Sequence, residues 1–333
     1  MSRISSGFSF PSSYPNMNLG RGLANKNIKL IAAIAFSVFT LLLPIVCYKM
    51  HTSLLGDETK SIQDERHYFQ VVYDWNMATF REIQSRAFSF KERGLDRLGF
   101  RKDCYLDPTS KEPIQWKENS SCLILFVHGL DGHPSHFAQY KSLLDAENRD
   151  IHLLYTLNRG RCSTEDGASP ILSIIANYRE KHSQNPIVLV GTSRGGPLMA
   201  HIELELRKHQ KSRVYVGTVS GANNGSYMMT LAKVFKVGFL LFPQELISVL
   251  DFNHEVPQSL IQKQKKPLSN QSVRQFDYWA TTGDLTVVPC SSGLPDIPDA
   301  SHFLVHGQGH TSIVDHVVEE VTSRVETFLS ESS

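Results

Sequence analysis

A serine stands between two glycines where an apolar run changes into a helical pattern. Ile187 to Val190 are apolar and largely β-branched, and Gly191-Thr192-Ser193-Arg194-Gly195 follows directly. A Gly-x-Ser-x-Gly motif between a strand and a helix places the serine on a sharp turn with its Oγ exposed. The helix N-terminus behind the serine favours the negative charge that develops during acyl transfer. Ser193 is therefore the candidate nucleophile.

A second apolar run predicts the groups that would stabilise this charge. Cys122 to Val127 is continuously apolar, as expected of a strand covered on both faces, and leads into His128-Gly129-Leu130. In acyl-transfer enzymes built this way, one oxyanion-hole N–H follows such a strand, and the other belongs to the residue after the nucleophile. We expect the main-chain N–H groups of Leu130 and Arg194 in these roles. His128 is expected to be a packed histidine at the strand end.

The general base is expected near the C-terminus. Phe303 to Val305 predicts a short strand, and a glycine-rich loop with His306 and His310 follows it. A histidine in such a loop, just before a C-terminal helix, is able to reach the serine. His310, directly after Gly309, is the better candidate, and His306 is the weaker one.

A carboxylate is needed to orient the imidazole of that base. Phe276 to Thr282 predicts a strand, and Gly283-Asp284 follows it. Asp284 would then lie at the carboxyl end of a strand, beside the other reactive groups. Asp277 lies near the start of the strand and should be remote, whereas Asp299 lies in a Pro-rich loop where turn chemistry explains it.

Five motifs together resemble those of the compact bacterial lipases of the α/β-hydrolase superfamily, over about residues 116–330. The resemblance implies an α/β fold with a mostly parallel central sheet flanked by helices, and the chain order Ser193, Asp284, His310 is the order of that superfamily. It implies no metal and no organic cofactor. The family often has Met after the nucleophile, so Arg194 is a departure that would put a cation beside the acyl pocket. The motifs are Val127-His128-Gly129-Leu130, Gly191-Thr192-Ser193-Arg194-Gly195-Gly196, Ser220-Gly221-Ala222-Asn223, Gly283-Asp284 and His306-Gly307-Gln308-Gly309-His310.

Composition limits the other function classes. The chain has 333 residues, 41% of them hydrophobic, and a net charge of +1, which allows one large core with an accessory region. A charge near zero gives no case for nucleic-acid binding. Five scattered cysteines are too few for a disulfide framework or a zinc site, so buried free thiols are expected.

The N-terminal part predicts a membrane anchor. Residues 1–27 contain no acidic residue and are rich in Ser, Asn, Gly and Pro, which favours disorder. Residues 28–48 include an almost wholly apolar run from Leu30 to Tyr48, which as a helix would rise about 28 Å, close to a bilayer core. The excess of Lys and Arg before this run predicts a cytoplasmic N-terminus, with the hydrolase domain on the other side.

Two segments are expected to accompany the hydrolase domain of residues 116–333. Residues 49–115 predict an amphipathic helix after Asp64, which would pack on the hydrolase, lie on the membrane or form a stalk, and then a hairpin turning at Asp107 to Ser110. Residues 227–250 are rich in Met, Phe and Leu. They predict either a deformable apolar wall or lid of the acyl pocket or an ordinary pair of core helices.

The sequence therefore predicts a membrane-anchored serine hydrolase that cleaves carboxylic, lipid-like esters through an acyl-enzyme. Its partners would be a small-molecule or lipid ester and the membrane. A thioesterase or amidase with the same triad is an alternative, because all three share the catalytic groups. A non-catalytic membrane-bound scaffold is a second alternative, although it would have no need of all three triad residues.

Overall fold

A computed structural model of the protein describes residues 68–98, 105–110, 112–208, 213–234, 244–252, 254–267 and 273–331. These residues belong to one compact unit, Val46–Ser333. The expected disordered segment 1–27 and the expected anchor 28–48 lie outside the described residues. Within those ranges, no helix combines the length and the apolar character needed to cross a bilayer.

The centre of the described chain is a parallel sheet in the order β2-β1-β3-β4-β5-β6, which confirms the expected α/β class. The chain runs from β1 to β2 at one edge and then returns to β3 on the other side of β1. Such a reversal places a crevice at the carboxyl ends of the strands, where ligands bind in open α/β sheets. The strands are β1 (Cys122–Val127), β2 (Arg149–Leu154), β3 (Ile187–Thr192), β4 (Arg213–Val219), β5 (Val273–Thr281) and β6 (Ser301–Val305).

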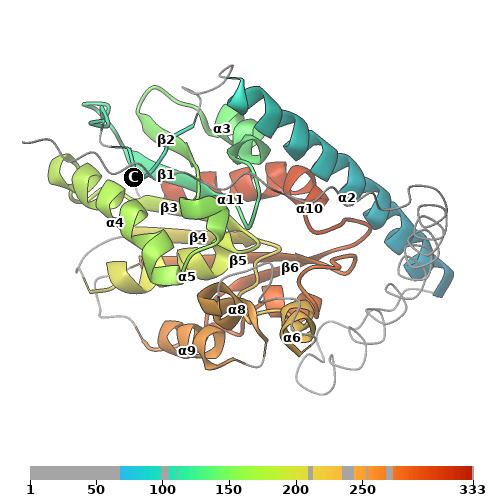
Figure 1. The fold of residues 1–333 in the computed structure, drawn as a ribbon. Helices are drawn as coiled ribbons and strands as arrows, with labels where there is room; N and C mark the ends of the chain where they lie inside the picture. The colour runs from blue at the N-terminus through green and yellow to red at the C-terminus, as the bar shows by residue number, and fades with distance from the viewer. Residues whose placement is uncertain are drawn as a thin grey trace, which may run out of the picture. The chain divides into compact units, whose positions relative to one another are not determined.

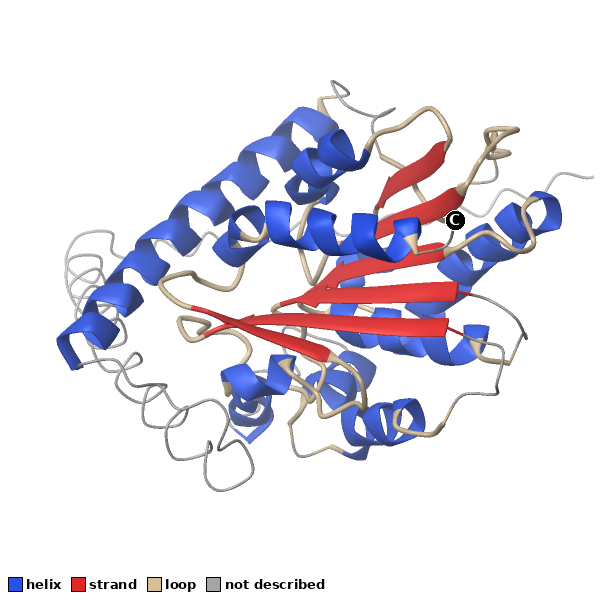
Figure 2. Cartoon of the chain, turned by 180° about the vertical axis from the view of Figure 1, so that it is seen from behind, coloured by secondary structure: helices blue, strands red, loops and turns tan. Residues whose placement is uncertain are grey.

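Helices cover both faces of the sheet (Figure 1 and Figure 2). Side chains alternate along a strand, so Leu123 and Leu125 of β1 join the core beneath α4 and α5. Ile124 and Phe126 join the core beneath α3, α10 and α11. The helices are α2 (Tyr68–Arg97), α3 (Ala138–Leu144), α4 (Thr164–Lys181), α5 (Gly195–Leu206), α6 (Tyr227–Val234), α8 (Gln244–Leu250), α9 (Glu255–Gln264), α10 (Ser312–His316) and α11 (Val318–Ser330).

After the serine motif, Leu198, Ile202 and Leu206 recur at helical spacing, which predicts one buried face of a helix with Glu203 more exposed. The three apolar side chains are buried as predicted. The prediction for Glu203 is wrong, because this side chain is fully buried. It is neutralised there by Arg207 at 2.5 Å and Arg274 at 3.1 Å, which is how a buried carboxylate is normally tolerated.

The free thiols follow expectation in part. Cys122 and Cys290 are buried and Cys162 is half-buried, and none of the three is in a disulfide within the described residues. Cys47 and Cys104 lie outside the described residues.

In the described part of the segment before residue 116, a helix is present as expected, and residues 107–110 form the expected turn, in which the Ser110 N–H donates to the Asp107 carbonyl. Within the described residues, Leu106 forms a parallel bridge with Leu154. The Leu106 N–H donates to the Leu153 carbonyl, and the Leu106 carbonyl accepts from the Tyr155 N–H. This bridge places the described segment beside β2, at the edge of the sheet. The helix is α2, which packs beside α10 and the turn Pro134–Phe137 (Figure 1).

Candidate active site

The serine motif forms a tight turn between β3 and α5. Ser193 has a positive φ of 53°, a left-handed conformation that is strained for a residue with a side chain. Gly191 is required beside it, since a Cβ there would lie 2.6 Å from the carbonyl oxygen of Gly195. This turn holds Ser193 at the carboxyl end of β3, where the strand order reverses.

The structure brings Ser193, His310 and Asp284 together from three separate loops. His310 Nε2 lies 2.8 Å from Ser193 Oγ, and His310 Nδ1 lies 2.7 Å from Asp284 Oδ2. Ser193 follows β3, Asp284 follows β5 and His310 follows β6. The carboxyl ends of these parallel strands meet at one edge of the sheet, which is why residues 117 positions apart share a hydrogen bond.

The carboxylate that faces His310 is held in place by its own loop. Asp284 is 2% exposed, and its Oδ1 accepts hydrogen bonds from the Thr286 and Val287 N–H groups at 2.7 and 2.8 Å. Asp277 is instead bound by both ends of the Arg324 guanidinium. Asp299 is exposed in its loop.

The other histidine of the C-terminal loop does not reach the serine. His306 is exposed, and its Nδ1 lies 3.0 Å from Thr282 Oγ1. His310 is 7% exposed. Burial by itself would lower the His310 pKa, but the charge and hydrogen bond of Asp284, with a further contribution from Glu82, raise it above its usual value. A raised pKa suits a histidine that accepts a proton beside a carboxylate.

The loop after β1 lies directly against the serine. A Cβ on Gly129 would lie 2.5 Å from Ser193 Cβ, so only glycine allows this approach. Within the described residues, neither the Leu130 nor the Arg194 N–H donates to a protein acceptor. His128 has the expected structural role: its Nδ1 lies 2.7 Å from the Gly129 carbonyl, and burial lowers its pKa to about 4.

The side chain of Arg194 does not put a cation beside the acyl pocket, as the sequence had suggested. Arg194 is 3% exposed and points towards the start of α4, where Nη2 lies 3.2 Å from Thr164 Oγ1. Burial lowers its pKa to about 10. Arg194 is not among the residues that line the cavity around Ser193, so its charge lies outside that cavity.

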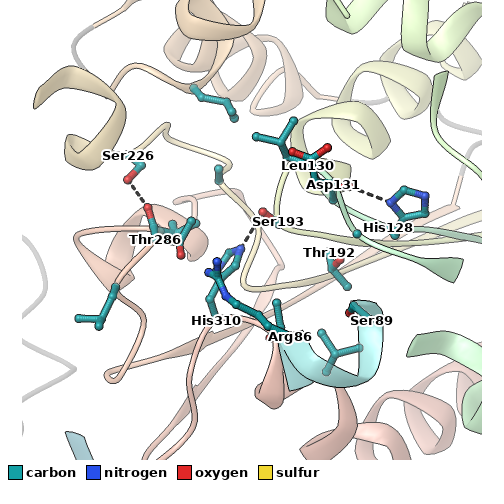
Figure 3. A pocket seen from close by; sticks show the side chains of 18 of the residues that line it. Arg86, Ser89, His128, Leu130, Asp131, Thr192, Ser193, Ser226, Thr286 and His310 are labelled. Atoms are coloured by element: carbon teal, nitrogen blue, oxygen red, sulfur yellow. Dashed lines mark hydrogen bonds between the residues drawn. The ribbon is translucent and has the colours of Figure 1, made fainter. Parts of the chain in front are cut away.

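Ser193 and His310 open into a cavity of about 510 Å³, shown from close by in Figure 3. One wall is apolar and comes largely from the 227–250 insertion. The other wall is polar and comes from α2. The apolar wall includes Met228, Met229, Ala232, Leu250 and Val287, and the polar wall includes Arg86, Ser89 and Arg93.

The described parts of the insertion line the cavity and also contribute to a small core. α6 provides the methionines of the cavity, whereas Leu246 and Val249 of α8 are buried in a small core with Ala222. Its middle, residues 235–243, lies outside the described residues. The cavity wall and the small core share residues from both ends of the insertion, because Leu250 belongs to both and Met229 packs against the core.

The contribution of α2 to the site was not foreseen from the sequence. Glu82 Oε2 accepts hydrogen bonds from the N–H and Oγ1 of Thr311, the residue after His310, at 2.7 and 2.9 Å. Arg81 donates to the Gly307 carbonyl at 2.6 Å. The only available signal was the charge on an amphipathic helix, which by itself does not identify the surface that the helix covers.

A second serine–histidine pair also lines the cavity. Ser89 Oγ is hydrogen-bonded to His136 Nε2, and His136 Nδ1 lies 4.0 Å from a carboxylate oxygen of Asp315. That separation is beyond a hydrogen bond, in contrast to the 2.7 Å between His310 and Asp284. Ser89 also lies inside a regular helix, without the strained turn that presents Ser193. The geometry therefore favours Ser193 as the nucleophile.

No protein-family model matches the sequence, and a search of curated proteins finds no relative. Solved structures similar to this one include the mature Bacillus licheniformis lipase BlEst2, at 15% identity over 64% of this chain and 95% of that chain, with a TM-score of 0.46. Est1E from Butyrivibrio proteoclasticus is 16% identical over 64% and 88% of the two chains, with a TM-score of 0.46. An α/β hydrolase superfamily protein from Enterococcus faecalis is 14% identical over 67% and 93%, with a TM-score of 0.44.

Proposed function

We propose that the protein is a serine hydrolase that cleaves carboxylic esters through an acyl-enzyme. The observation that carries this proposal is the continuous hydrogen-bonded chain from Ser193 Oγ through His310 to Asp284, at 2.8 and 2.7 Å. The chain ends beside a cavity, and its serine sits on a strained turn. A nucleophile, a base and an orienting carboxylate in this arrangement constitute the parts needed for acyl transfer.

In this mechanism Ser193 Oγ attacks the ester carbonyl carbon and passes its proton to His310 Nε2. Asp284 keeps the Nδ1 proton on the imidazole and stabilises the imidazolium that forms. The Leu130 and Arg194 N–H groups donate to the oxyanion of the tetrahedral intermediate. His310 then protonates the departing alcohol, and water releases the acyl group by the same steps.

The substrate we propose is lipid-like. An apolar wall of Met228, Met229 and Leu250 suits an acyl chain, because methionine side chains adapt to flexible apolar ligands.

We also propose that residues 28–48 anchor the enzyme in a membrane. An anchored chain should stay in the membrane pellet after an alkaline carbonate wash. Release of the full-length chain into the supernatant would contradict the anchor.

The proposed chemistry is tested most directly with a fluorophosphonate probe, which labels an activated serine whatever its substrate. The wild-type protein should be labelled, and Ser193→Ala should lose both labelling and at least about 10³-fold of ester hydrolysis. Ser89→Ala is the matched control, because this serine also lines the cavity and contacts a histidine; it should still be labelled. A wild-type protein that is folded and unlabelled would instead favour the non-catalytic scaffold.

A further inference from the structure

The polar wall of the cavity is one face of α2. Arg86, Ser89 and Arg93 all line the cavity, and their spacing of three and four residues places them on the same side of a helix. In Figure 3, Arg86 and Ser89 extend from α2 on the side of the site where His310 and Thr192 lie. The two arginines are separated by two turns, which is about 10 Å along the helix. Positive charge therefore extends along the whole wall.

The two arginines lie at opposite ends of the reactive centre. Arg86 is close enough to His310 that its charge acts to lower the pKa of the imidazole. Arg93 Nη1 donates to the Asp131 carbonyl at 3.0 Å, in the loop that carries Leu130. A bound ester at Ser193 would thus have one guanidinium beside its base and another beside its oxyanion loop.

Much of this hydrogen-bonding capacity is unused. Arg93 donates only to main-chain carbonyls, those of Ser89 and Asp131, and forms no ion pair within the described residues. Arg86 uses its Nε for Glu82 at 2.6 Å, and its two terminal nitrogens donate to nothing in the described part of the chain. A guanidinium with free N–H groups is a typical partner for phosphate or carboxylate oxygens.

We propose that the substrate is an ester whose alcohol half carries an anionic group, a phosphate or a carboxylate, that Arg93 and Arg86 bind. This inference rests on the proposed esterase function and names its substrate class. The acyl chain lies against Met228, Met229 and Leu250, which leaves the α2 wall to the alcohol. Two walls of opposite chemistry on either side of Ser193 thus match an amphiphilic ester with an apolar acyl chain and a charged alcohol.

The test compares three esters with the same acyl chain: 1-hexanoylglycerol 3-phosphate, 3-hexanoylglycerate and neutral 1-hexanoylglycerol. Hexanoate release gives kcat/KM at a pH on the plateau of the pH profile. The wild-type enzyme should prefer at least one anionic ester by about tenfold, and the preference should fall as salt is added. Comparing kcat/KM for the phosphate ester with that for the carboxylate ester identifies which anion the α2 wall binds.

Arg93→Gln should lower kcat/KM for the preferred anionic ester by about tenfold more than for the neutral ester, which removes most of this preference. Arg86→Gln should remove less, because its side chain is 62% exposed and shares its charge with Glu82. Lys91→Gln is the matched control, since it removes one positive charge from an exposed position of α2 outside the cavity. It should leave all three rates as they are.

Equal kcat/KM values for the charged and neutral esters in the wild-type enzyme would overturn the inference. So would an Arg93→Gln variant that slows all three esters by the same factor, because Arg93 would then only position the Asp131 loop. Neither result contradicts the proposed esterase function. That function fails separately, and this inference with it, if no ester is hydrolysed and Ser193 is not labelled.

Discussion

The two sides of the candidate site are built in different ways. Ser193, Asp284 and His310 stand on loops at the ends of the parallel strands β3, β5 and β6, and the buried sheet fixes their positions. The residues on the other side come from α2, a surface helix with large exposed apolar residues such as Phe90. Reactive groups thus depend on the rigid core, whereas the groups around them depend on how one added helix packs. Substitutions on the sheet side should therefore abolish chemistry, and those on α2 should only adjust it.

The largest effect expected on the sheet side, beyond loss of the serine itself, is that of Asp284→Asn. The amide would favour the wrong tautomer of His310, so kcat should fall by about 10³- to 10⁴-fold. Asp299→Asn makes the same chemical change at an exposed loop position and should leave kcat unchanged. Steady-state kinetics of both purified variants measure this difference. A crippled Asp299→Asn enzyme beside an active Asp284→Asn enzyme would refute the assigned acid.

Glu82→Gln, a substitution on α2, should lower kcat less than Asp284→Asn does. Glu82 bonds Thr311 beside His310, and its charge helps to raise the His310 pKa. The amide should lower kcat about tenfold by loosening this loop, and it should lower the pKa of the base. The acid limb of the kcat/KM profile should then move to lower pH, because the imidazole stays neutral further down the pH scale.

Glu180→Gln is the control for this helix effect, because it changes an exposed carboxylate on α4, away from the cavity. Its pH profile should superimpose on that of the wild type. If Glu82→Gln lowers kcat without moving the acid limb, Glu82 supports the loop mechanically and does not act on the base through its charge.

The smallest expected effect is the change in kcat/KM as the acyl chain of the ester is lengthened by one CH₂ at a time. Each CH₂ buried against the apolar wall is worth about 0.8 kcal/mol, close to fourfold in kcat/KM, so rates should rise from acetyl to octanoyl esters until the cavity is full. Met229→Asp should flatten this rise. Leu231→Asp is the matched control on the same helix, since Leu231 is 39% exposed and does not line the cavity. Highest activity on acetyl esters would point to a short-chain esterase.

Local patterns in the sequence were sufficient to predict the strands that precede the oxyanion loop and the three candidate triad residues. A continuous apolar run predicted β1 with the correct ends, and the runs before Ser193, Asp284 and His310 fall on β3, β5 and β6. These signals are local because a strand buried on both faces needs an unbroken apolar stretch. A glycine is needed wherever the backbone approaches closely, as at Gly191. Because the strands are parallel, the three loops that follow them lie at the same edge of the sheet.

Only the tertiary structure decided what surrounds those residues. Glu82 and Thr311 are 229 positions apart, and no local pattern indicates that they meet. The burial of Glu203 likewise depends on Arg274, which lies 71 positions away, and the direction of the Arg194 side chain depends on the start of α4. Charged side chains on helices carry no spacing rule that identifies their distant partner, so their roles are set only when the helices pack against the sheet.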